Sequence, residues 1–256
     1  MTTQLPKLIH KDMVLTRNYI QEVAHVLGAL QRALVKRDPH DWYYGLEVGP
    51  RGLTTQQLML ATKEVRASLD LVRHKVRLDG NAWPLSDYAA PEIFKNIKLW
   101  LQNERSDASI SQPEFVGGVR HFDKHQADLY AEALWWMDGQ FGALKSSLKK
   151  GLTSPVLLYP HHFDLSLVWF PRADEKQLAI GFSTGDQTIA EPYLYLTAYP
   201  EPPGFTKLPV PKGAYWQTDG FSGAILPYAT LSASSDPEAL FASYASVMTA
   251  ARTLLG

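Results

Sequence analysis

The chain has 256 residues, of which 45% are hydrophobic, 11% aromatic and 20% charged, and it contains no cysteine. Disorder is excluded, because disordered chains combine few aromatic residues with a high net charge, and the formal net charge here is −1. The lack of cysteine excludes thiolate nucleophiles, iron–sulfur clusters and zinc sites built on sulfur. The near balance of 25 basic and 26 acidic residues argues against a nucleic-acid partner, which would require a basic stripe.

No targeting or membrane segment is expected. The apolar runs all fall short of the ~20 residues that span a bilayer. The first residues, Met1-Thr-Thr-Gln-Leu-Pro-Lys, lack the continuous apolar stretch of a secretory signal. We therefore expect a cytoplasmic protein with no membrane partner, and the sequence leaves its oligomeric state open.

The first half of the chain is predicted to contain two helices with strands between them. Apolar residues recur every three or four positions over residues 13–35, which predicts a helix that Asp38-Pro39 ends. A second helix is expected to start after Ser86-Asp87 and to run to Asn103. Turn residues and alternation predict four strands between the helices, at residues 42–48, 53–60, 65–71 and 75–79. The polar, serine-rich segment 105–113 is the expected linker.

The second half follows the same order. A long helix is predicted over residues 123–150, ended by Gly151, and a last helix begins at the N-cap Asp236 with Pro237 in its first position. The strands between them are expected at residues 156–159, 163–170, 177–183, 193–199 and 223–226. Five prolines make residues 200–213 a stiff, extended connection.

Because helix–strands–helix occurs twice, we predict an α+β fold in which antiparallel sheets are covered by long helices. The two similar halves would be residues 10–104 and 121–256 of a single domain, 1–256. Gly28-Ala29-Leu30 and Gly142-Ala143-Leu144 occupy matching points of the two long helices. Chance similarity explains so short a match equally well, so the internal duplication stays open.

The sequence His162-Phe163-Asp164 provides a candidate metal site. On a strand, alternate residues share a face, so His162, Asp164 and Ser166 would point the same way. Iron sites with two histidines and one carboxylate present ligands in this manner. Polar side chains facing solvent at a strand entry are the alternative. A Ser166-based hydrolase triad is disfavoured, because residues two apart on a strand lie too far from direct contact and no Gly-x-Ser-x-Gly elbow is present.

A second His-Phe-Asp begins at His121. His121 and His125 are four residues apart, with Asp128 three further on, and would share one face if the helix began that early. Convergence of His121 and His125 with His162 and Asp164 would hold a divalent metal. An ordinary polar helix start explains the same residues without one.

Alternating aromatic residues mark a candidate binding face. Tyr193, Tyr195, Thr197 and Tyr199 alternate with apolar residues, so one strand face carries rings with hydroxyl groups. Such a face suits a small-molecule pocket, and it also suits a half-exposed sheet face beneath a loop. The predicted ligand-binding residues are His161, His162, Asp164, Tyr193 and Tyr195.

Four motifs in order resemble one family. They are Arg51-Gly-Leu-Thr-Thr55, Ser154-Pro-Val156 with Phe163-Asp-Leu165, the segment Tyr199-Pro-Glu-Pro-Pro-Gly-Phe205, and Leu226-Pro-Tyr228. Together they resemble a bacterial family catalogued only as a domain of unknown function, over nearly the whole chain. Family members often carry Trp-Gly-Ser before Phe-Asp-Leu, where this chain has His161-His162. The resemblance implies one domain and no particular reaction.

The leading hypothesis is a protein that binds a small ligand in a polar–aromatic pocket. A metal-dependent enzyme using His162 and Asp164 with His121 or His125 is the first alternative. A protein-interaction module, based on the prolines between Pro200 and Pro211, is the second. The sequence does not decide whether the protein is an enzyme.

Overall fold

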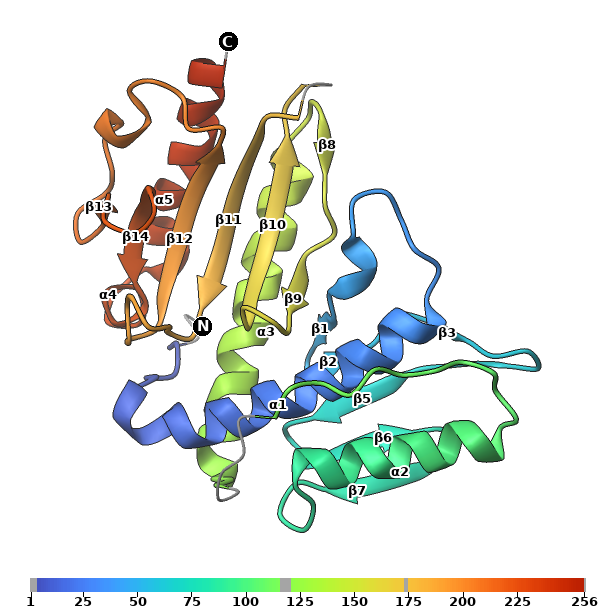
Figure 1. Cartoon of the computed structure of the whole chain (residues 1–256). Helices are drawn as coiled ribbons and strands as arrows, with labels where there is room; N and C mark the ends of the chain where they lie inside the picture. The colour runs from blue at the N-terminus through green and yellow to red at the C-terminus, as the bar shows by residue number, and fades with distance from the viewer. Residues whose placement is uncertain (1–3, 116–120, 173–174, 256) are drawn as a thin grey trace. The chain divides into compact units, whose positions relative to one another are not determined.

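The computed structural model describes residues 4–115, 121–172 and 175–255 of the chain. Its main helices are α1 (His10–Leu34), α2 (Ala90–Asn103), α3 (Lys124–Ser147), α4 (Tyr228–Ser232) and α5 (Pro237–Arg252) (Figure 1). Short 3-10 helices occupy Trp42–Tyr44, Phe205–Lys207 and Thr253–Leu255. The contacts divide the chain into two compact units: unit 1 combines 1–10, 136–156 and 164–256, and unit 2 combines 11–135 and 157–163.

The strands are short in unit 2 and longer in unit 1. In unit 2 they are β1 (Glu47–Gly49), β2 (Gly52–Thr54), β3 (Leu58–Met59), β4 (Glu64–Val65), β5 (Ala67–Asp70), β6 (Lys75–Leu78), β7 (Asn81–Pro84) and β9 (Leu157–Tyr159). In unit 1 they are β8 (Leu152–Thr153), β10 (Asp164–Phe170), β11 (Gln177–Ser183), β12 (Tyr193–Tyr199), β13 (Tyr215–Gln217) and β14 (Gly223–Pro227).

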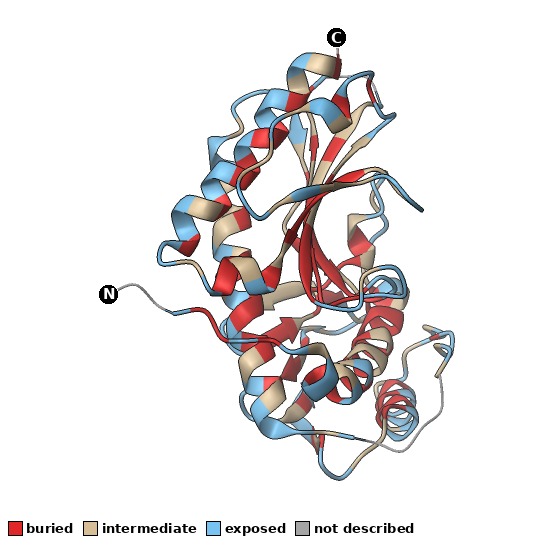
Figure 2. Ribbon diagram, turned by 90° about the vertical axis from the view of Figure 1, so that its left-hand side faces the viewer, coloured by how far each residue is buried: buried red, intermediate tan, exposed pale blue. Residues whose placement is uncertain are grey.

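Unit 1 is an antiparallel sheet with the strand order β8-β10-β11-β12-β14-β13. The face that carries Leu167, Leu178 and Trp169 packs against helix α5, where the Arg252 guanidinium lies 5.8 Å from the centre of the Trp169 ring. On the same helix the Tyr244 hydroxyl donates to the carbonyls of Leu194 and Ala224, at 3.3 and 2.6 Å. Figure 2 shows these strands largely buried beside their helices. The apolar side chains that alternate along β10, β11 and β12 therefore form the core of this unit.

Unit 2 builds a second antiparallel sheet, in the order β1-β2-β5-β6-β7, beside the small β3-β4 hairpin. Helix α2 directs Ile93, Ile97 and Leu101 inward, and its Trp100 Nε1 donates to Asp79 Oδ2 at 3.2 Å. Helix α1 supplies a fully buried amide, Gln31. Both units therefore combine an antiparallel sheet with helices.

These elements confirm the predicted α+β class, and the ranges of β11 and β12 agree with the prediction. Some details were wrong. Trp42–Tyr44 is a 3-10 helix rather than the start of a strand, and the strand expected at residues 53–60 is divided into β2 and β3. Strands β7, β8 and β13 were not predicted, because two to four residues are too few to show a period. The internal duplication and the single domain stay predictions.

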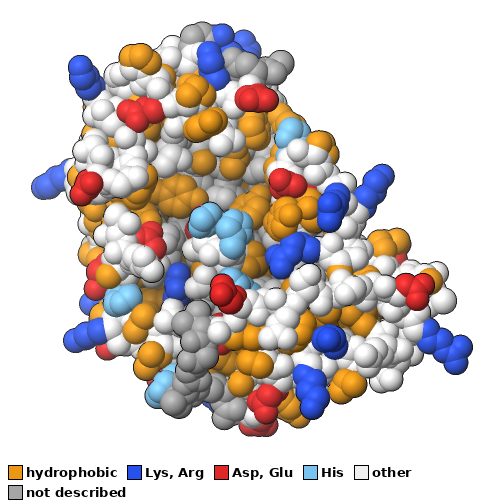
Figure 3. All heavy atoms as spheres, in the orientation of Figure 1, with side chains coloured by type: hydrophobic (Ala, Val, Ile, Leu, Met, Phe, Trp, Pro, Cys, Tyr) orange, Lys and Arg blue, Asp and Glu red, His pale blue; other side chains and the backbone are white. Residues whose placement is uncertain are grey.

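Helix hydrophobicity and surface charge both bear on which partners the protein has. None of the helices among the described residues combines the length and the apolarity that a membrane span requires. On the face drawn in Figure 3, the acidic and basic side chains are interspersed rather than gathered by sign. This distribution agrees with the balanced composition.

A half-buried carboxyl in unit 1 gives a pH prediction. Burial raises the pKa of Asp138 on α3 from 3.8 to about 6. The unfolded chain releases this proton at lower pH than the folded chain, so stability is lost as the pH rises from 4 to 7. We expect Asp138→Asn to stabilise the protein at pH 7.5 by about 1 kcal/mol, reduced from the full shift because solvent screens a half-exposed group.

Urea unfolding at pH 7.5 and near pH 3.5 measures this effect. The gain from Asp138→Asn should disappear at the lower pH, where the native carboxyl is already protonated. Asp107→Asn makes the same charge change at an exposed position and should leave stability within ~0.5 kcal/mol at both values. A gain that persists at acid pH would show that ionisation of Asp138 is not its cause.

Candidate functional site

The second face of the unit 1 sheet is polar and aromatic. Asp164 and Ser166 on β10 and Ser183 on β11 are among the buried polar residues of the chain. The register aligns Tyr193 with Ser183 and Asp164 in one row across three strands. The next row aligns Tyr195 with Gly181 and Ser166. The sequence predicted this face for Tyr193 and Tyr195, and the pairing of the strands brings both tyrosines to Asp164.

Tyr195 and Asp164 form the centre of this group. The Tyr195 hydroxyl donates a hydrogen bond to Asp164 Oδ2, although the two residues lie on strands separated by β11. The tyrosine ring crosses the intervening strand directly above Gly181, where an added Cβ would lie 2.3 Å from the Tyr195 Cζ. Glycine is therefore required at residue 181 for the ring to reach the carboxylate.

Tyr193 is held by a separate carboxylate in the loop that follows β11. Its hydroxyl donates to Asp186, whose Oδ1 also accepts from the backbone N–H groups of Thr188 and Ile189, at 2.6 and 2.9 Å. The Tyr193 and Tyr195 rings lie 6.4 Å apart, centre to centre. Asp186 thus organises the loop and fixes the first tyrosine beside the second.

Both phenols in this group remain protonated. Burial, together with the charge and hydrogen bond of Asp164, raises the pKa of Tyr195 well above its ordinary value of 10. Burial and the hydrogen bond to Asp186 raise the pKa of Tyr193 in the same direction. At neutral pH the two hydroxyl groups therefore act as hydrogen-bond donors to carboxylates. We name Asp164, Ser166, Ser183, Tyr193 and Tyr195 the tyrosine–aspartate cluster.

The two adjacent histidines lie in a turn of unit 2 rather than on a strand. Strand β10 begins at Asp164, and the preceding Phe163 has a φ of 54°, so the predicted strand alternation from His162 to Asp164 is wrong. The His161 and His162 rings are 4.2 Å apart, and both side chains are exposed. Partial burial and the neighbouring His162, His25 and Arg32 lower the pKa of His161 to about 4, so it is neutral at pH 7.

Side chains of helix α1 form polar contacts with the backbone of the same turn. The His25 ring Nε2 lies 2.7 Å from the Pro160 carbonyl, and Gln21 Nε2 donates to that oxygen at 3.1 Å. Burial lowers the pKa of His25, partly opposed by this contact with Pro160. The histidine turn and the tyrosine–aspartate cluster belong to different units, and we treat them as two groups. A single site formed by His161, His162, Asp164, Tyr193 and Tyr195 stays a prediction.

The His-Phe-Asp motif at His121 does not have the helical geometry that was considered for a metal site. Helix α3 begins at Lys124, so His121 precedes it and does not share a helical face with His125. Both histidines are exposed, and Asp128 Oδ1 lies 2.9 Å from Nε2 of His74. Within residues 4–115, 121–172 and 175–255, no three His, Asp or Glu side chains are grouped as metal ligands. A metal bound by His121, His125, His162 and Asp164 stays a prediction.

Sequence reasoning missed three residues of the site. Ser183 is the last residue of a predicted strand, and its position beside Asp164 depends on the register. Gly181 gave no specific sign of its role, because glycine within a strand marks a bulge, a bend or a close approach alike. Asp186 follows Gly185 in the loop after β11, and its tyrosine partner was not identifiable from spacing.

Comparison with known proteins agrees with the motifs described above. No curated protein and no solved structure matches the chain. A model of a family of unknown function (DUF5996) matches residues 5–85 and 116–255, which is most of the sequence and includes the tyrosine–aspartate cluster. The chain therefore belongs to this family of unknown function.

Proposed function

We propose that the protein binds a small ligand at the tyrosine–aspartate cluster. The observation that carries this proposal is the hydrogen bond from Tyr195 across Gly181 to the buried Asp164 carboxylate. Taking a carboxylate out of water is costly, and an apolar sheet face would be simpler to stabilise. A carboxylate held in one orientation by a protonated phenol is instead suited to recognise a ligand.

The chemistry of the cluster limits what it would bind. Asp164 accepts a hydrogen bond from Tyr195, and the aromatic rings of Tyr193 and Tyr195 lie next to each other beside it. A matching ligand carries N–H or O–H donors next to a small apolar part, as an amine or a polyhydroxylated compound does. A bacterial source and a cytoplasmic location accompany this proposal as expectations from the sequence.

A ligand-observed NMR screen of small amines and polyols tests the proposal. For any compound that binds, Asp164→Asn and Tyr195→Phe should each weaken binding about tenfold, equivalent to about 1.4 kcal/mol. Tyr195→Phe keeps the ring and removes only the hydroxyl group that holds the carboxylate. The result would show that binding depends on the hydrogen-bonded pair.

Tyr199→Phe is the matched control, because Tyr199 lies on the same strand and face but is 67% exposed. It should leave the dissociation constant unchanged. An equal loss in all three variants, or a ligand whose affinity none of them alters, would contradict binding at this cluster. Thermal unfolding of each variant checks that the fold is retained.

A further inference from the structure

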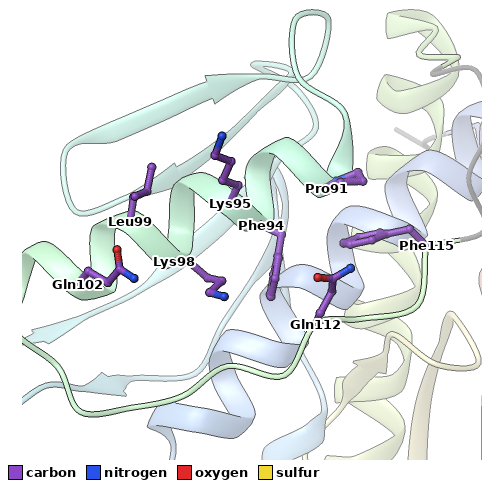
Figure 4. A pocket seen from close by; sticks show the side chains of 8 residues that line it. All are labelled: Pro91, Phe94, Lys95, Lys98, Leu99, Gln102, Gln112 and Phe115. Carbon is purple, nitrogen blue, oxygen red and sulfur yellow. The ribbon is translucent and has the colours of Figure 1, made fainter.

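A hollow of about 290 Å³ lies in unit 2, along helix α2. One stripe of the helix lines it at spacings of three and four residues, and the segment that follows the helix contributes two more side chains (Figure 4). The lining residues are Pro91, Phe94, Lys95, Lys98, Leu99, Gln102, Gln112 and Phe115. Its volume is at the lower end of the range for small-molecule pockets.

Two rings form the apolar part of this hollow. Phe94 of α2 and Phe115 of the following segment meet edge to face, with their centres 6.2 Å apart. In Figure 4 these rings approach from the two sides of the hollow, with Gln112 beside them. Leu99 adds an aliphatic side chain that is 47% exposed. A planar apolar group would find aromatic and aliphatic surface here.

Two cations form its polar part. Lys95 and Lys98 both line the hollow, and the Lys98 ammonium lies 5.9 Å from the centre of the Phe94 ring. The acidic side chains at the two ends of α2 are engaged elsewhere. Glu92 accepts from the Ala89 N–H at 2.7 Å, and Glu104 pairs with Lys63 at 2.8 Å.

Neither lysine has an ion-pair partner among the residues that the structure describes. A bound anion would supply the opposite charge that the described residues do not provide for these lysines. The geometry points to a binding site for a small aromatic anion, such as an aryl carboxylate, in the hollow between α2 and the segment 112–115. Residues 86–115 lie outside the ranges matched by the family model. The inference is independent of the tyrosine–aspartate cluster.

The fluorescent anion 2-naphthoate is a direct probe, and its neutral isostere 2-naphthamide separates charge from shape. We expect 2-naphthoate to bind at least fivefold more tightly than 2-naphthamide, and acetate not to displace it. The double variant Lys95→Gln/Lys98→Gln should weaken 2-naphthoate binding at least fivefold and leave 2-naphthamide unchanged. Phe115→Leu should weaken both, because it removes the ring.

Lys145→Gln/Lys149→Gln removes the same charge near the C-terminal end of α3 and is the matched control. It should not alter either affinity, and equal losses in the two double variants would overturn the site in favour of general charge attraction. Equal affinity for the acid and the amide would also overturn it, as would no binding of 2-naphthoate up to about 10 mM. All substituted lysines lie at the surface, so the variants should fold, and thermal unfolding verifies this.

Discussion

Replacing Gln31 with Glu should destabilise the protein by about 3–5 kcal/mol, because it changes a buried amide into a carboxyl of the same shape. The Gln31 side chain is fully buried, and its Nε2 donates to the carbonyls of Tyr43 and Gly45, both at 2.7 Å. Its Oε1 accepts from the Gln56 backbone N–H at 2.7 Å. A carboxylate would place an oxygen against two carbonyl oxygens and lose both donors.

Urea unfolding measures the loss of unfolding free energy in Gln31→Glu, and repeating it at lower pH tests whether the introduced charge causes the loss. Protonating the introduced carboxyl removes its charge and returns one donor, so the deficit of Gln31→Glu should shrink as the pH falls. Gln102→Glu makes the same chemical change at an exposed position of α2 and should cost less than ~0.5 kcal/mol. Similar costs at the two positions would contradict the role assigned to the Gln31 amide.

Gln31 also illustrates how much of the fold the sequence could predict. Its helix was predicted because apolar residues recur along α1, and Gln31 lies four residues after Leu27 and three before Leu34. A polar residue on that buried stripe signals a hydrogen-bonded partner in the core. The partners themselves, Tyr43 and Gly45, lie in a segment where a 3-10 helix replaces the predicted strand.

The candidate site was predictable in part for the same reason. Strict alternation placed Tyr193 and Tyr195 on one face of β12, and the structure confirms that face. The alternation could not show that β11 separates Tyr195 from Asp164, since register and strand order arise from pairing between distant segments. It also failed at His162, because the left-handed conformation of Phe163 interrupts the strand. The hollow beside α2 was missed because Phe115 follows a segment that was expected to be only a linker.

The second large effect is expected for Gly181→Ala. An alanine Cβ would lie 2.3 Å from Cζ and 2.4 Å from the hydroxyl oxygen of Tyr195, distances that require the ring to move. Moving the ring breaks its hydrogen bond to Asp164 and disturbs a tightly packed sheet face. We expect a loss of about 2–4 kcal/mol in unfolding free energy, together with loss of any ligand bound at the cluster.

A double-mutant cycle assigns this cost to the Tyr195 ring. Tyr195→Val removes the ring, so adding Gly181→Ala to that variant should cost less than ~0.5 kcal/mol. Gly139→Ala is the control, because Gly139 lies in helix α3 with no atom within 4 Å of an added Cβ, and alanine should stabilise it by up to about 1 kcal/mol. A full penalty for Gly181→Ala without the Tyr195 ring would mean that the strand backbone itself requires glycine. If the two substitutions are additive in this way, the small size of residue 181 is not what allows Tyr195 to reach Asp164.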